Sequence, residues 1–287
     1  MSRLQKLLEL RAAIDAIDNR MHDLLRVRAD IVHRVRAVKG KQAIFIRPGR
    51  EATMLRALLQ RQQGRIPPGL ITSLWRSMIG AFTMQEGALC VAVTVGAGQD
   101  DLWDLTRDYY GSVTPLTPCA TPERAIKAVV AGKAELAIVP LPTPHDTKPW
   151  WRLLARYPDL RVFARLPFDL NDLGRSNGRG NKTGALAIAR IDPETTGDDH
   201  GLVLVRVTNR AAAGRIRAEL KQRLKPVAIA GDPGQEYWLL TLRGLVDRGA
   251  DVLDSKRYSG RYPGVSLHYC GGYALPLALK SVRAGKK

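Results

Sequence analysis

The chain has 287 residues, of which 45% are apolar, so it is long enough to bury more than one hydrophobic core. This composition excludes a disordered protein and favours two or three globular domains. The formal net charge is +18, and strongly basic proteins often bind anions, most commonly nucleic acid. The positions of the charges on the predicted elements therefore decide which kind of anion the chain meets.

The cysteines and the apolar segments indicate the compartment. Cys90, Cys119 and Cys270 lie far apart and form no Cys-x-x-Cys pair, so neither a disulfide framework nor a zinc site is expected. No apolar run approaches the roughly 18 residues of a membrane helix, and the N-terminus shows no apolar signal segment. We therefore expect a cytoplasmic protein that binds neither a membrane nor a metal.

Residues 4–39 contain no glycine or proline and repeat apolar side chains with a heptad period. The two series are Leu7, Ile14, Met21, Arg28, Val35 and Leu10, Ile17, Leu24, Ile31, Val38. This pattern predicts one long helix with a packing seam. At about 1.5 Å per residue the helix exceeds ~50 Å, more than one compact domain covers with its own chain, so it needs a partner. Arg28 stands at an apolar position of the period, where it either reaches the surface, fixes the register or binds a ligand.

Two shorter helices are predicted to follow. The first begins near Pro48 and ends at Gly64, because proline suits a first helical turn and glycine a C-cap. Glu51 shares its inner face with the apolar residues Met54, Leu55, Leu58 and Leu59. The second helix follows residues 67–69 and carries the inner stripe Ile71, Leu74, Trp75, Met78, Ile79 and Phe82. Glu86 continues that stripe, although a single glutamate at a helix end is usually solvated.

Several charges fall on faces that should be buried, namely those of Arg28, Glu51 and Glu86. Buried charge is costly unless it is paired or binds a ligand. Lys39 follows Arg28 by about three helical turns, ~16 Å along the axis, so their long side chains could hold one small dianion between them. Arg11 lies on the same flank as Lys39 but about 42 Å away. An antiparallel partner helix would bring Arg11 of a second chain to the site.

These charges lie in segments that resemble a known family. The segments are Leu7-Leu8-Glu9-Leu10-Arg11, Leu25-Arg26-Val27-Arg28, Val38-Lys39 and Arg47-Pro48-Gly49-Arg50-Glu51. They resemble the type II chorismate mutases, and the resemblance covers residues 4–87. The run MIGAFTMQEGAL followed by CVAVTV is similar to the junction in bifunctional chorismate mutase/prephenate dehydratases. That second resemblance extends weakly over the rest of the chain.

The resemblance implies an intertwined homodimer of three-helix domains, with two sites for chorismate, each shared between the chains, and no cofactor. Arg11 of the other chain, Arg28 and Arg50 would bind the two carboxylates of chorismate. Lys39 would bridge a carboxylate and the ether oxygen that breaks, and Glu51 would hold the ring hydroxyl. The resemblance thus makes these five residues the substrate-binding set, with Arg28 and Lys39 also catalytic.

Glu86 completes the implied site, since it falls where the family has a Gln or Glu that hydrogen-bonds the ether oxygen. Glu86 is therefore expected to be both substrate-binding and catalytic. The chain departs from the family at Arg47, where some members carry an Asp, and at Phe82, where some have a small polar residue. The Claisen rearrangement of chorismate to prephenate needs no nucleophile, base or metal. It needs a fixed substrate conformation and stabilised charge on the ether oxygen, which cations in a dry pocket provide.

The rest of the chain changes period and is predicted to be α/β and then α+β. We divide the chain into a helical mutase domain (1–87), an α/β lobe that resembles a degenerate dehydratase (88–168), a Gly- and Asn-rich linker (169–184) and a small α+β domain (185–287). The run TGDDHGLVLVRVTNR resembles the start of the regulatory ACT domain of the dehydratases.

Dehydratase activity is expected to be absent. Dehydratases carry Thr-Arg-Phe where this chain has Thr183-Gly184-Ala185, and their Gly-Pro-Glu-Gly-Thr-Phe loop is replaced by residues 95–100. The sequence therefore predicts a chorismate mutase that acts in phenylalanine and tyrosine synthesis. Two alternatives stay open: a bifunctional enzyme that also dehydrates prephenate, and a catalytically silent regulator that binds aromatic metabolites or nucleic acid. The buried positions of the arginines favour a small dianion over nucleic acid, which is bound through exposed arginines.

Overall fold

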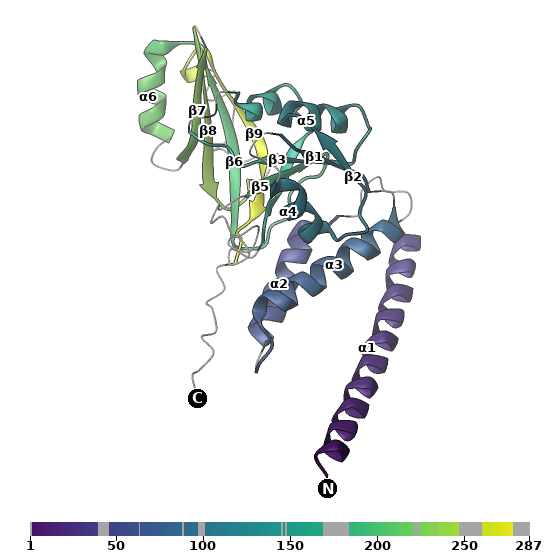
Figure 1. The fold of residues 1–287 in the computed structure, drawn as a ribbon. Helices are drawn as coiled ribbons and strands as arrows, with labels where there is room; N and C mark the ends of the chain where they lie inside the picture. The colour runs from purple at the N-terminus through teal and green to yellow at the C-terminus, as the bar shows by residue number, and fades with distance from the viewer. Residues whose placement is uncertain are drawn as a thin grey trace.

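The computed structural model describes residues 2–39, 46–62, 64–87, 89–96, 101–144, 146, 148–168, 184–220, 224–232, 234–246 and 260–277. Three helices come first in the chain: α1 (Arg3–Lys39), α2 (Pro48–Arg61) and α3 (Pro68–Glu86). An α/β region and an antiparallel α+β region follow (Figure 1). The predicted fold class, helical at first and then α/β and α+β, is confirmed.

Helix α1 confirms the long helix that the heptads predict, and it extends well beyond the rest of the molecule (Figure 1). Its apolar seam residues are exposed in the single chain, including Leu10, Ile17 and Leu24. A row of exposed apolar side chains on a helix of this length is a surface that gains stability when another surface covers it. The predicted homodimer remains a prediction.

Helices α2 and α3 differ from their predicted details in two ways. Helix α2 begins at Pro48 as predicted but ends at Arg61, three residues before Gly64, because Gln62 is extended and its Nε2 donates to the Ile66 carbonyl at 2.5 Å. Helix α3 buries Ile71, Thr72, Arg76 and Gly80, whereas Leu74 of the predicted stripe is exposed.

The buried face of α3 is rotated because helix α4 (Asp101–Tyr110) packs against it. Gly80 allows this approach, since a Cβ there would lie 1.8 Å from the Tyr110 carbonyl oxygen. A contact with an element of the α/β region cannot be read from the period of α3 alone.

The described strands form one nine-stranded sheet of order β2-β1-β3-β5-β4-β9-β6-β8-β7. The α/β region supplies one half of this sheet and contains two parallel strand pairs. Its elements are β1 (Val91–Thr94), β2 (Leu116–Cys119), α5 (Pro122–Val130), β3 (Leu136–Pro140), the 3-10 helix η1 (Trp150–Ala155), β4 (Arg161–Leu166) and β5 (Ala185–Ala189). Strands β2, β1 and β3 are parallel, and β5 runs antiparallel between β3 and β4. Strands β1 and β5 are buried along their whole length, as expected where both faces of a sheet are covered.

The second half of the sheet is antiparallel, and its elements are β6 (Asp199–Val207), α6 (Arg210–Leu220), β7 (Lys225–Asp232), β8 (Gln235–Arg243) and β9 (Val265–Ala274). Strand β9 lies between β6 and β4 and joins the two halves through the pair Val162 and Gly271. A Cβ at Gly271 would lie 2.2 Å from the Val162 carbonyl oxygen, so only glycine permits this junction. Within the described ranges, no helix is long and apolar enough to cross a membrane.

The division of the chain into four segments remains a prediction. The strand pairing indicates a different start for the last segment, the α+β domain. Strand β5, which begins at Ala185, pairs with β3 and β4 of the α/β region and not with β6. We therefore propose that the α+β domain begins after β5, in the segment that leads to Asp199. Residues 169–183 of the predicted linker and residues 97–100 of the first predicted loop lie outside the described residues.

Candidate active site

A pocket of about 260 Å³ lies between α1, α2 and α3. It is lined by Arg28, Ile31, Val32, Val35, Arg47, Arg50, Glu51, Met54, Ile79, Phe82 and Thr83. Three of the predicted substrate-binding residues, Arg28, Arg50 and Glu51, thus meet in one cavity. Arg28 comes from α1, whereas Arg50 and Glu51 come from the first turn of α2. The two positions that depart from the family, Arg47 and Phe82, line the same cavity.

Arg28 is half-buried, and its guanidinium carbon lies 4.6 Å from the centre of the Phe82 ring. A guanidinium at this distance from an aromatic face is attracted by the ring quadrupole. The departure at Phe82 therefore supplies a surface that holds Arg28 at the pocket. This contact explains how a cation occupies an apolar position of the heptad pattern.

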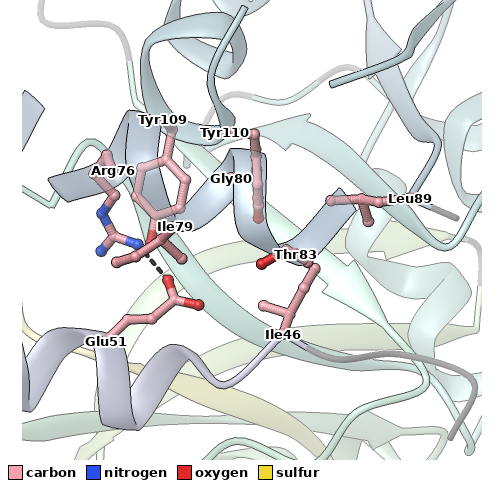
Figure 2. A pocket seen from close by; sticks show the side chains of 9 residues that line it. All are labelled: Ile46, Glu51, Arg76, Ile79, Gly80, Thr83, Leu89, Tyr109 and Tyr110. Atoms are coloured by element: carbon pink, nitrogen blue, oxygen red, sulfur yellow. Dashed lines mark hydrogen bonds and ion pairs between the residues drawn. The ribbon is translucent and has the colours of Figure 1, made fainter. Parts of the chain in front are cut away.

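Glu51 is bound by an arginine that sequence reasoning missed. Its Oε2 lies 2.6 Å from Arg76 Nη1, and the two side chains are only 14% and 6% exposed (Figure 2). The Arg76 guanidinium also lies 4.0 Å from the centre of the Tyr109 ring of α4. The sequence held a signal, since Arg76 is the one charged residue between Ile71 and Phe82 in an otherwise apolar stripe.

The tyrosines beside this ion pair stay neutral. Burial raises the pKa of Tyr109 to about 12, although Arg76 opposes the shift, and burial raises the pKa of Tyr110 well above 10.0. Neither phenol can then replace Glu51 as the counter-ion of Arg76 near neutral pH. The carboxylate of Glu51 is therefore the group that compensates the buried guanidinium.

A second, much smaller cavity lies behind Glu51, and Figure 2 shows the side chains around it. Its volume is about 10 Å³, and it shares Glu51, Ile79 and Thr83 with the larger pocket. This volume holds one water-sized group, so only the larger pocket can hold a metabolite. Glu51 lines both cavities, whereas its partner Arg76 lines the smaller one.

The first turn of α2 is bound by Glu194, which lies between β5 and β6 and was also missed. Glu194 Oε1 accepts from Arg47 Nε at 2.7 Å and lies 2.6 Å from Arg47 Nη2, and Oε2 accepts from the Arg50 backbone N–H at 3.1 Å. No sequence signal could have found this residue, because it is distant in the chain and lies outside any regular element.

The remaining predicted residues are only partly described. Lys39 ends α1 and Glu86 ends α3, and their side chains lie outside the described residues. The two helix ends lie together, because Arg36 Nη1 donates to the Gln85 carbonyl at 2.5 Å. Arg11 is exposed on α1, about 25 Å along the helix from Arg28, and does not line the pocket of its own chain. The binding roles of all six residues remain predictions.

Residues 10–87, which comprise α2, α3 and nearly all of α1, match the family described as chorismate mutase type II. The pocket and its lining residues lie inside the matched region.

Curated relatives include bifunctional chorismate mutase/prephenate dehydratases. Over 147 residues, the protein of Stutzerimonas stutzeri is 29% identical and that of Pseudomonas aeruginosa 26% identical, and each match covers 49% of this chain and 40% of the relative. The match to the protein of Neisseria gonorrhoeae is 27% identical over 131 residues, covering 46% of this chain and 36% of that one. The chain thus spans less than half the length of these relatives.

Two prephenate dehydratases are among the similar solved structures. The enzyme of Streptococcus mutans has a TM-score of 0.46 at 12% identity, covering 66% of this chain and 100% of that one. The enzyme of Arthrobacter aurescens, in complex with L-Phe, has a TM-score of 0.46 at 15% identity, covering 68% and 93%. Neither likeness bears on activity.

Proposed function

We propose that the protein is an isomerase that converts chorismate to prephenate, because residues 10–87 match the type II chorismate mutase family. One observation carries the proposal: the pocket between α1, α2 and α3 presents Arg28, Arg50 and Glu51 inside the region that matches the family. A cavity with fixed cations and one carboxylate suits a dianion that carries a hydroxyl. The cytoplasmic location and the role in phenylalanine and tyrosine synthesis remain part of the proposal.

The proposed mechanism divides the work between binding and charge stabilisation. Arg28 and Arg50 bind the two carboxylates and hold the enolpyruvyl chain over the ring, while Glu51 accepts a hydrogen bond from the ring hydroxyl. Lys39 and Glu86 donate to the ether oxygen as negative charge grows on it. Fixing the reacting conformation lowers the entropic part of the barrier, and donors aimed at the ether oxygen lower the electrostatic part.

The site is completed by a second chain in this proposal. The exposed apolar seam of α1 packs against the same seam of a partner, antiparallel, so that the partner's Arg11 reaches the pocket. The position of Arg11, outside the pocket of its own chain, supports this arrangement.

Loss of chorismate absorbance on addition of the purified protein tests the activity. Arg28→Ala should lower kcat/KM about 10- to 100-fold, because a hydrogen-bonded charge is worth roughly 1.5 to 3 kcal/mol. Arg26→Ala is the matched control, since Arg26 is exposed on the same helix and pairs with the exposed Asp23 at 3.8 Å. Chorismate that decays at the spontaneous rate with well-folded wild-type protein would refute the proposal and favour a silent regulator.

An acid step in the same assay distinguishes a mutase from a bifunctional enzyme. We propose that the α/β region does not dehydrate prephenate, because Gly184 stands where dehydratases carry an arginine. Gly184 is buried, and a Cβ there would lie 2.6 Å from Leu141 Cδ1 and 3.3 Å from the Leu166 carbonyl oxygen, so a longer side chain at this position would require Leu141 to move. Phenylpyruvate should therefore form only after acid is added. Its enzymatic formation near neutral pH would establish the bifunctional alternative.

The role of Glu86 gives a pH dependence. A carboxyl group donates a hydrogen bond only when it is protonated, and an ionised Glu86 would repel the ether oxygen. Turnover should therefore fall as the pH rises through the ionisation of Glu86 in the complex. Glu86→Gln donates at every pH, so it should flatten this limb and keep its activity at high pH. Profiles of kcat/KM from about pH 5 to 9 check this, and superimposable profiles would remove Glu86 from the mechanism.

A further inference from the structure

We propose that Glu194, outside the mutase region, is a positioning residue for the mutase pocket, which it controls through Arg47 and the first turn of α2. This inference rests on the proposed function. Glu194 contacts two pocket-lining residues at once, since one carboxylate oxygen binds the Arg47 side chain and the other accepts from the Arg50 backbone N–H.

Glu194 supplies a hydrogen-bond acceptor that the start of α2 lacks within its own helix. The first N–H groups of a helix lack partners inside the helix and attract negative charge. Arg47 is the N-cap residue of α2 and makes no side-chain cap hydrogen bond, and the Arg50 backbone N–H in the first turn donates to the Glu194 carboxylate instead. Part of the binding site is thus organised by a residue beyond the domain that binds the substrate.

The segment around Glu194 is packed tightly on α2. A Cβ at Gly49 would lie 2.5 Å from Glu194 Cβ, so glycine is required for this contact. About two turns further on, Arg56 donates to Thr196 Oγ1 at 2.7 Å and to the carbonyl oxygens of Asp198 and Leu275 at 3.0 Å each. This second set of bonds fixes the segment relative to α2, so that Glu194 meets the first turn in one position.

The contact also sets the charge that the pocket offers. Among the described residues, three arginines line the pocket: Arg28, Arg47 and Arg50. Glu194 binds the Arg47 guanidinium through two of its nitrogens, which neutralises it and holds it at the α2 end. Without Glu194, Arg47 becomes an additional free cation that competes for a substrate carboxylate and holds it away from the reacting geometry.

This competition predicts a particular kinetic change. In Glu194→Gln the dianion still binds, now with one more cation, so KM should stay equal or fall. The kcat should drop on the order of tenfold, because misplaced substrate reacts slowly. Arg47→Gln added to Glu194→Gln removes the competing cation and should restore at least half of the lost kcat. A contact that only docks two domains would give no such rescue.

Glu236→Gln is the matched control, because Glu236 pairs with Arg217 at 3.3 Å and the two side chains are 32% and 55% exposed, against 30% and 49% for Glu194 and Arg47. It should leave kcat and KM unchanged. Wild-type kinetics in Glu194→Gln, or a lower kcat that Arg47→Gln does not restore, would overturn the proposal.

Hydrogen exchange separates this proposal from the proposed function. In Glu194→Gln, the peptide that contains the Arg50 amide should exchange faster than in the wild type, whether or not the protein acts on chorismate. An inactive wild type would defeat the mutase assignment and leave this measurement valid. Unchanged exchange in that peptide would defeat the role of Glu194 in fixing the first turn of α2.

Discussion

Chains with Arg11→Ala and chains with Lys39→Ala should each be nearly inactive, and mixing them as heterodimers should restore activity. In the proposed mechanism each residue donates to the substrate or to its ether oxygen, and loss of such a donor costs about 10²- to 10³-fold in rate. In a heterodimer, one site combines Lys39 of the Arg11→Ala chain with Arg11 of the Lys39→Ala chain, so that site is intact. Random pairing makes about half of the dimers mixed, so about a quarter of wild-type activity should return.

The control for this experiment is the mixture of Arg28→Ala and Lys39→Ala chains. Arg28 lines the pocket of its own chain and Lys39 ends the same helix, so the proposal puts both in the same half of a site. Each site of that heterodimer then carries one lesion, and activity should stay low. Heterodimers of the first pair that are verified by mass and still inactive would contradict the shared site.

Arg76→Met should destabilise the fold by about 3 to 5 kcal/mol, the usual cost of removing one partner from a buried ion pair. Glu51 would remain largely buried. Among the described residues, its salt-bridge partner is Arg76. The Arg76 guanidinium also packs 4.0 Å from the Tyr109 ring, so the contact between α3 and α4 would weaken as well. Denaturant unfolding measures the change, which should appear as a lower midpoint.

Two comparisons sharpen the Arg76 prediction. Arg107→Met changes an exposed arginine of α4 and should alter the free energy of unfolding by less than about 0.5 kcal/mol. The double variant Glu51→Gln with Arg76→Met removes the stranded charge and should be more stable than Arg76→Met alone. A double variant no more stable than the single one would show that Arg76 acts by packing and not by pairing with Glu51.

The helical third of the chain could be predicted because its signals are local. The heptads define α1, and Pro48 sets the start of α2. Glu51 could be assigned to a buried face from the apolar residues that follow it within one or two turns. These inferences use only the 3.6-residue period, which acts within one helix.

The parts that could not be predicted depend on contacts between distant segments. The buried face of α3 was misplaced because α4 covers it, and Gly80 gives no sign of that approach when the sequence is read alone. Glu194 lies in an irregular connection, where no period links it to Arg47. The position of β5 beside β3 and β4 follows from sheet pairing, which a run of apolar residues does not specify.

The place of β9 between β4 and β6 has a consequence for the order in which the protein folds during synthesis. The ribosome releases helices α1 to α3 before the described strands, and β9 after all the others. Until β9 emerges, β4 and β6 present open edges, and Arg56 of α2 lacks the Leu275 carbonyl that it finally binds. Pairings between segments so far apart form slowly. While the residues between β4 and β9 are translated, the nascent chain must therefore keep these edges and the apolar seam of α1 from associating wrongly.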